Sequence, residues 1–223
     1  SDGSQPTWDI LPGNGVDSRE PDDDGDATRF KIQVPNPHIE VRYKDDYIEG
    51  YDWPLNAWVD LTVNGNPVGT SQQVGVCDWN PDETCVDFDL DGLHDVVPGD
   101  VVALTDGTTT KTHTVTSLEI TDVDPDTDVV TGVAEPGAEV HIWACGDDTC
   151  SDNRHETADG SGNWSTDFSD GSQPTWDILP GNGVDSKEPD DDGDATLFGM
   201  VKGGSVSGHV EDEQGNQIGR AHV

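Results

Sequence analysis

Closely spaced carboxylates are the side chains of this sequence best suited to chemistry. In two similar loops, aspartates alternate with other residues around a glycine that permits a sharp turn. Ca²⁺ binds six to eight hard oxygen atoms, and such a loop can supply several of them. The pattern predicts a structural calcium site in each loop. The expected ligands are Glu20, Asp22, Asp24 and Asp26 in one loop, and Glu188, Asp190, Asp192 and Asp194 in the other.

Two further acidic runs are also candidates for calcium. Asp87, Asp89 and Asp91 fit the first positions of an EF-hand loop, although alternation alone would place them on one solvated face of a strand. Neither this run nor the two glycine loops has the glutamate that an EF-hand requires at its last position. The second run lies where a linker between domains is expected, and a bound cation would stiffen that joint. It comprises Asp122, Asp124, Asp126 and Asp128.

A surface adapted to high salt is the alternative explanation for these aspartates. In that case they are spread for solvation and bind no ion specifically. Clustering against glycine favours calcium, whereas the low lysine content favours the salt adaptation. The sequence leaves both interpretations open.

The four cysteines fall into two close pairs, which in a small, acidic, loop-rich chain predicts disulfides and an oxidising compartment. The expected bonds are Cys77–Cys85 and Cys145–Cys150. The second pair also lies between two histidines, as His141-x3-Cys145-x4-Cys150-x4-His155, and these residue types can bind zinc. Because the first pair has no histidine nearby, disulfides explain both pairs alike and are favoured over zinc.

Catalysis has little support, and the chain is predicted not to be an enzyme. The run from His155 to Asp159 begins like a zinc-protease motif but lacks its second histidine. Neither a nucleophile elbow nor a phosphate-binding glycine loop occurs. Tryptophans such as Trp58 and Trp79 could stack on sugars, so a glycan is kept as an alternative ligand, although packing is their more common use. Asn163 heads a glycosylation sequon.

The net charge of −37, from 47 Asp and Glu against 10 Lys and Arg, limits the classes of partner. Such a chain repels phosphate backbones and anionic lipid head groups, which excludes nucleic acid and the membrane surface. No apolar run reaches the length of a transmembrane span, so no membrane insertion is expected. Acidity and paired cysteines together predict an extracellular or cell-surface location.

A long internal repeat organises the chain. Residues 1–30 (the first copy) return as residues 169–198 (the second copy), and only Arg19 to Lys187 and Arg29 to Leu197 differ. The offset of 168 residues is too long for a solenoid repeat and suits a module of two domains. The sequence is interpreted as one module, the end of a preceding module and the start of a following one.

Strands are the elements that must position these side chains. Apolar and polar residues alternate over residues 38–43, 57–63, 86–90, 100–104 and 111–115, and turn residues separate these segments. No segment has a helical period, and 26 Gly and 14 Pro interrupt the chain often. We predict an all-β chain of tandem antiparallel β-sandwich domains of Ig-like type.

Residues 119–168 resemble the bacterial Ig-like repeats of large surface proteins and adhesins. The resemblance rests on the segment Gly132-x-Ala134-Glu135-Pro136-Gly137-Ala138-x-Val140 and on Ala158-Asp159-Gly160-x-Gly162-Asn163-Trp164-Ser165. It implies a turn at Pro136-Gly137 and a tryptophan, Trp164, that caps the core. Residues 119–168 supply too few strands for such a domain, so residues 175–178 and 195–198 are expected to close it. By analogy, residues 8–10 and 27–30 are expected to close a preceding domain.

The end of the chain, residues 205–223, resembles the opening of carboxypeptidase-regulatory-like β-sandwich modules, which serve as spacers or anchors. The expected domains are residues 1–30, which end a preceding Ig-like unit; residues 31–118, a β-sandwich; residues 119–198, an Ig-like domain that includes the second copy; and residues 199–223, the start of the last module.

The repeat favours a structural function, because arrays of modules duplicate for length. We predict a tandem module of an extracellular surface or filament-forming protein, acting as a spacer stiffened by calcium and disulfides. An adhesin and a non-catalytic region of a secreted hydrolase are the alternatives. The expected partners are further copies of the chain or adjacent modules, joined head to tail. Trp8, Ile10 and Phe30 lie in strands that would need such a partner.

Overall fold

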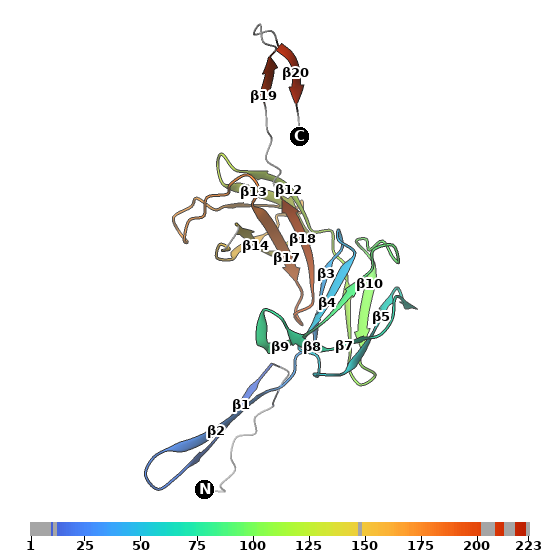
Figure 1. Ribbon diagram of the computed structural model, residues 1–223, viewed down its shortest axis with the longest axis vertical. Coiled ribbons are helices and arrows are strands. Elements are labelled where there is room, and N and C mark those ends of the chain that lie inside the picture. The colour runs from blue at the N-terminus through green and yellow to red at the C-terminus, as the bar shows by residue number, and fades with distance from the viewer. Residues whose placement is uncertain (1–9, 11–12, 147–148, 202–207, 212–216, 222–223) are drawn as a thin grey trace.

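The computed structural model of this chain describes residues 10, 13–146, 149–201, 208–211 and 217–221, and these residues form strands β1 to β20 without any helix (Figure 1). The prediction of an all-β chain is confirmed. Trp8, one of the three residues expected in assembly, lies outside the described residues.

The first sandwich uses the alternating segments found in the sequence. One of its layers contains β3 (His38–Arg42), β4 (Tyr47–Tyr51), β9 (Asn80–Asp89) and β8 (Gly75–Cys77). The facing layer contains β11 (Thr110–Thr114), β10 (Val101–Thr105), β5 (Trp58–Val63), β6 (Asn66–Pro67) and β7 (Gln72–Gln73). Alternation decides which side chains meet between the layers, so β5 buries Val59 and Leu61 and exposes Trp58.

The second sandwich begins at residue 119. One layer consists of β12 (Glu119–Asp124), β13 (Val129–Val133) and β16 (Asn163–Asp167). The other contains β15 (Arg154–Thr157), β14 (Glu139–Cys145), β17 (Gly183–Pro189) and β18 (Ala195–Val201). Trp164 is buried and lies opposite Gly132 on β13, where a Cβ atom would approach its ring to 2.1 Å. Trp164 therefore packs in the core, as the Ig-like resemblance implies.

A single eight-stranded sheet crosses the boundary between the two sandwiches. Its strand order is β15-β14-β17-β18-β3-β4-β9-β8, and the central pair, β18 with β3, is parallel. In that pair Ala195 lies opposite Glu40 and Leu197 lies opposite Arg42. The sequence predicted sandwiches that follow one another, but it gave no sign that the second copy joins the two through one sheet.

The strand expected over residues 175–178 is absent, and that expectation is wrong. Isolated hydrogen bonds hold this region in place of a strand ladder. Arg154 donates to the carbonyl of Pro174 at 2.7 Å, the N–H of Trp176 donates to the carbonyl of Phe168 at 2.9 Å, and the N–H of Ile178 donates to Asp128 at 2.8 Å. Ile178 is nevertheless fully buried, so the segment fills the core without entering a sheet. The closing strands are β17 and β18, and the sequence analysis identified only the second.

The first copy forms a hairpin of β1 (Gly15–Pro21) and β2 (Ala27–Gln33) that extends away from the sandwiches in Figure 1. Near the other end of the chain, β19 (Gly208–Glu211) pairs with β20 (Gln217–Ala221). This second hairpin alone does not test the resemblance of residues 205–223 to a carboxypeptidase-regulatory-like module, which stays a prediction.

Both expected disulfides are present. Cys77–Cys85 links β8 to β9, and Cys145–Cys150 closes the connection that leaves β14. No cysteine of the chain is free. The alternative in which the second cysteine pair binds zinc is thereby excluded.

Candidate functional site

The turn between β17 and β18 gathers three of the predicted calcium ligands. The N–H of Asp190 donates to the carbonyl of Asp194 at 2.8 Å, and Gly193 has a φ of 95°, which favours glycine. This tight turn brings oxygen atoms of Asp190, Asp192 and Asp194 within 4.8 Å of one another. Their number and spacing suit a hard divalent cation.

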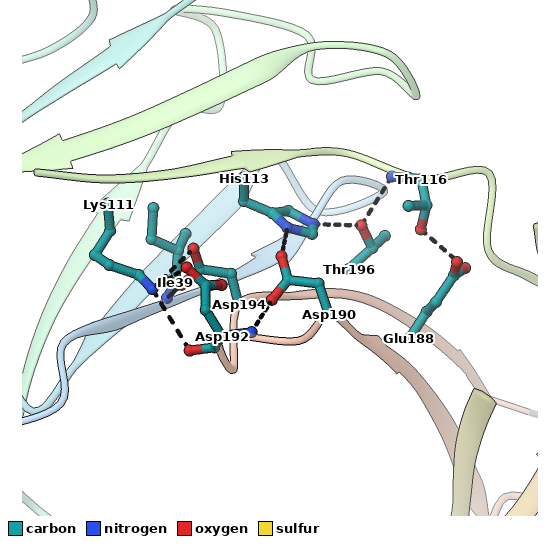
Figure 2. Close-up of polar contacts among 9 residues, drawn as sticks. All are labelled: Ile39, Lys111, His113, Thr116, Glu188, Asp190, Asp192, Asp194 and Thr196. Carbon is teal, nitrogen blue, oxygen red and sulfur yellow. Dashed lines mark hydrogen bonds and ion pairs between the residues drawn. The ribbon is translucent and has the colours of Figure 1, made fainter. Parts of the chain in front are cut away.

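A lysine from the first sandwich lies against these carboxylates (Figure 2). Lys111 on β11 places Nζ 2.5 Å from Asp192 Oδ2 and 3.5 Å from Asp194 Oδ2. Asp194 is fully buried, and its other oxygen accepts the N–H of Ile39 on β3 at 2.7 Å. Burial raises the pKa of Asp194 to about 6, and the hydrogen bond from Ile39 and the charge of Lys111 oppose that rise.

His113 on β11 also contacts the turn between β17 and β18 and the start of β18. Burial lowers the pKa of His113, although Asp190 opposes the shift, so the ring is neutral at neutral pH. Because a carboxylate only accepts, His113 donates from Nδ1 to Asp190 at 3.2 Å, and its Nε2 accepts from the hydroxyl of Thr196 at 2.9 Å. That hydroxyl oxygen in turn accepts the N–H of Thr116 at 2.9 Å. A directed chain of hydrogen bonds therefore crosses from β11 to β18.

Glu188 does not join the aspartate cluster. Its carboxylate is buried and accepts the hydroxyl of Thr116 at 2.9 Å, and burial raises its pKa. Its spacing alone placed Glu188 among the predicted calcium ligands. In the structure it is another contact of the joint between the sandwiches.

The first copy provides a natural comparison, because the same loop sequence is exposed there. The turn has the same local hydrogen bonds, with the N–H of Asp22 donating to the carbonyl of Asp26 at 2.9 Å. Oxygen atoms of Asp22, Asp24 and Asp26 again lie within 4.8 Å of one another, but all three residues are exposed. Glu20 is exposed on β1 and stands outside this cluster.

The remaining calcium candidates do not converge within the part of the chain that the structure describes. Asp87 and Asp89 lie on the exposed face of β9, as alternation alone predicts, and Asp91 follows that strand. The other run is not a linker, and that interpretation was wrong. Asp122 and Asp124 lie on β12, and Asp126 and Asp128 lie in its turn to β13. There Asp124 accepts hydrogen bonds from the backbone of Asp126 and the hydroxyl of Thr127.

A groove on the first sandwich contains the exposed Trp79. Its volume is about 700 Å³, and its lining includes His38, Tyr51, Glu49 and Asp82. The rings of His38 and Tyr51 stack with centroids 5.3 Å apart, and Trp79 meets Tyr51 edge-on at 6.2 Å. The side chain of Trp79 is 62% exposed, so one face of this aromatic group is open to a ligand. The sequence analysis named Trp79 but could not place the other rings beside it.

Lys111, His113 and Thr116 were missed by the sequence analysis. They belong to an ordinary alternating segment and its connection, and nothing in that segment indicates which loop it contacts. Their partners lie about eighty positions away in the chain. The parallel pairing of β18 with β3, which joins the two sandwiches, helps bring them together.

No family model and no curated protein matches the sequence. Solved structures to which this chain is similar include a tetra-tandem repeat in the extending region of a large adhesion protein, at 14% identity and a TM-score of 0.28, covering 86% of this chain and 57% of that one. A 1.5-MDa bacterial ice-binding adhesin is similar at 13% identity and a TM-score of 0.24, over 85% of this chain and 73% of that one.

A third similar structure is SGBP-B of the Bacteroides ovatus mixed-linkage glucan utilization locus, solved with a mixed-linkage heptasaccharide. It has 13% identity and a TM-score of 0.25, over 94% of this chain and 58% of that one. This chain thus spans little more than half the length of two of the three. Such distant likenesses assign no function. The described residues contain no helix that is long and apolar enough to cross a membrane.

Replacing Lys111 with methionine is expected to lower the free energy of unfolding by about 1–3 kcal/mol, between the values for exposed and fully buried pairs. The substitution keeps the aliphatic stem but leaves the buried carboxylate of Asp194 without its neighbouring cation. Urea denaturation at low ionic strength measures the change. Lys31→Met is the matched control, because it removes the same charge from the exposed β2. Equal losses in both variants would contradict a specific role for Lys111.

Proposed function

We propose that this chain is a structural module of an extracellular surface or filament-forming protein, and that the repeated hairpin is the joint between its successive domains. One observation carries the proposal: the same hairpin sequence is buried between strands in the second copy and exposed in the first. Val184 and Phe198 are 0% and 6% exposed, whereas their counterparts Val16 and Phe30 are 38% and 65% exposed. The proposal gives the chain no catalytic role.

The exposed hairpin has the features of an interaction element. Its two strands present unpaired backbone edges and apolar side chains, which together favour the addition of further strands. Its partner would be a module with a slot like the one between β14 and β3, which the second copy fills here. Such a contact uses different surfaces on its two members, so successive modules would form a line and not a closed pair.

The two sequence differences between the copies affect how the first copy would fit a slot like that between β14 and β3. Lys187 pairs with Glu40 at 2.5 Å, and Arg19 can keep that pair in a similar slot. Leu197 is 1% exposed, whereas the first copy has Arg29 at this position. A slot for the first copy must therefore accommodate a guanidinium, for which a nearby carboxylate is the natural partner.

The joint can be tested by placing a module ahead of the first copy. In a chain that carries residues 31–168 fused ahead of residue 1, the first copy follows the same sequence that precedes the second. Amide hydrogen exchange of residues 15–30 is expected to slow from the rate of an exposed hairpin to that of residues 183–198, because docking buries their hydrogen bonds. The unfused chain is the reference.

An Arg29→Leu version of the fused chain tests whether the arginine side chain prevents docking into a slot that would accept leucine. Protection in both fused chains would support the joint. Fast exchange of residues 15–30 in both would refute it. Protection in the Arg29→Leu version alone would show that the first copy does not fit a module of this sequence.

We further propose that calcium binds the aspartate loops, first of all the loop of the first copy. The support is the convergence of three exposed carboxylates, which repel one another unless a cation neutralises them. In the second copy Lys111 already supplies a positive charge, so calcium is expected to bind there less strongly. A salt-adapted surface is the competing explanation and predicts no such difference between loops.

Asp24→Asn is expected to remove calcium binding at the first loop, since one of three clustered carboxylates is lost. Asp23→Asn is the matched control: it removes the same charge from the same turn, but Asp23 lies outside the cluster. Titration calorimetry with calcium in sodium chloride measures both. If the two variants bind calcium alike, or if sodium replaces calcium equally well, the acidity serves salt tolerance.

A glycan is a second candidate partner, supported by the groove around Trp79. Exposed aromatic rings stack on the apolar faces of sugars, and the carboxylates of Glu49 and Asp82 can accept sugar hydroxyls. Trp79→Ala is expected to abolish any oligosaccharide binding that a glycan array detects for the parent chain. Trp58→Ala is the control, since Trp58 is similarly exposed on another sheet. Binding that survives Trp79→Ala would exclude this groove.

A further inference from the structure

Two histidines and a glutamate meet on the outer face of the second sandwich. His141 on β14 lies directly opposite His155 on β15, and Glu139 lies two residues before His141 on the same strand. Residues two apart on a strand point to the same face, so all three side chains share one surface. Because β15 is the edge strand of the eight-stranded sheet, this surface is open beyond it.

One carboxylate oxygen of Glu139 lies within hydrogen-bond distance of both imidazole rings. Glu139 Oε1 lies 2.9 Å from His141 Nε2 and 3.1 Å from His155 Nδ1. The two imidazole centroids are 4.1 Å apart, and the three ligand atoms all lie within 4.8 Å of one another. The side chains of Glu139 and His155 are more than half exposed, so neither is needed to fill the core.

We propose that Glu139, His141 and His155 bind a late first-row divalent cation, for which Zn²⁺ is the representative ion. Two imidazoles and one carboxylate are a ligand set that zinc accepts, with water in the open position. Ligand atoms of a tetrahedral zinc ion, bonded at about 2.0–2.1 Å, lie about 3.3 Å apart. The observed separations of 2.9 and 3.1 Å need to grow by only a few tenths of an ångström.

The backbone holds the two strands in place for this geometry. The disulfide Cys145–Cys150 closes the connection between β14 and β15, and the N–H of Ser151 donates to the carbonyl of Ala144 at 2.8 Å. The cysteines that the sequence placed between these histidines therefore act as a clamp and not as ligands. On the other side of β14, Lys187 lies opposite His141, but its ammonium is paired with Glu40.

Ligand chemistry distinguishes this site from the aspartate loops. Imidazole nitrogen favours zinc, copper and nickel, whereas carboxylate oxygen alone favours calcium and magnesium. Zinc binding at Glu139, His141 and His155 should therefore persist in excess calcium. A bound ion would also fix the edge strand β15 to β14. The inference does not depend on the proposed joint, because the ligands lie on β14 and β15, whereas the joint pairs the other edge of β14 with β17.

The test is zinc binding by the full chain, with its disulfides intact, in excess calcium. Competition with a chromophoric zinc chelator is expected to show one zinc ion bound per chain. Glu139→Gln and His155→Ala should each weaken binding by about tenfold or more, since each alters a direct ligand and loss of even an outer-shell partner costs about 10–100-fold in metal affinity. Both side chains are exposed, so these variants should keep the parent's melting temperature without zinc. Zinc should raise that temperature for the parent and not for the variants.

Glu156→Gln is the matched control, because this neighbour of His155 points to the other face of the strand. It should bind zinc as the parent does. The proposal is overturned if the parent binds no zinc in the presence of calcium. It is equally overturned if Glu139→Gln and His155→Ala bind zinc as tightly as Glu156→Gln, because the ion would then lie elsewhere in the chain.

Discussion

The buried carboxylate of Asp194 governs how the two sandwiches meet. It accepts the N–H of Ile39 and lies beside Lys111, and the parallel pairing of β18 with β3 begins at the next residue, Ala195. A buried carboxylate without such partners would cost several kcal/mol, so the register that supplies them is favoured. The contacts of Thr116 with Thr196 and Glu188, and of Lys187 with Glu40, hold the same eight-stranded sheet together around it.

The two copies of the hairpin separate local from tertiary contributions to the fold. Strand register and turn hydrogen bonds are the same in both, because the glycine turn and the antiparallel ladder need only the local sequence. Burial differs at almost every position, because it depends on neighbours that only the second copy has. The sequence therefore encodes the shape of the hairpin, while the adjoining domains decide whether it is part of a core.

The same division explains what the sequence could predict. Alternation identified β3, β5, β10 and β11, because each buries one face in its own sandwich. It failed for residues 175–178, because hydrogen bonds of Arg154 to the carbonyl of Pro174 and of the Ile178 N–H to Asp128 hold this region, and no local pattern records them. Alternation also does not show that His155 lies beside Glu139 and His141, because the pairing of residues on neighbouring strands depends on register. The aspartates of the candidate site could be predicted from their spacing, but Lys111, which faces them from another domain, could not.

If calcium binds the aspartate loop as proposed, it competes with docking of the hairpin. In the second copy an ammonium lies 2.5 Å from Asp192, within the space that a cation bound to the three carboxylates would need. The first copy has the same three carboxylates and no such lysine among its described neighbours. A module that docks there with its own counterpart of Lys111 would displace a bound calcium ion. Calcium would then protect the free hairpin against self-repulsion, and a lysine from the neighbouring domain would replace it when the joint closes.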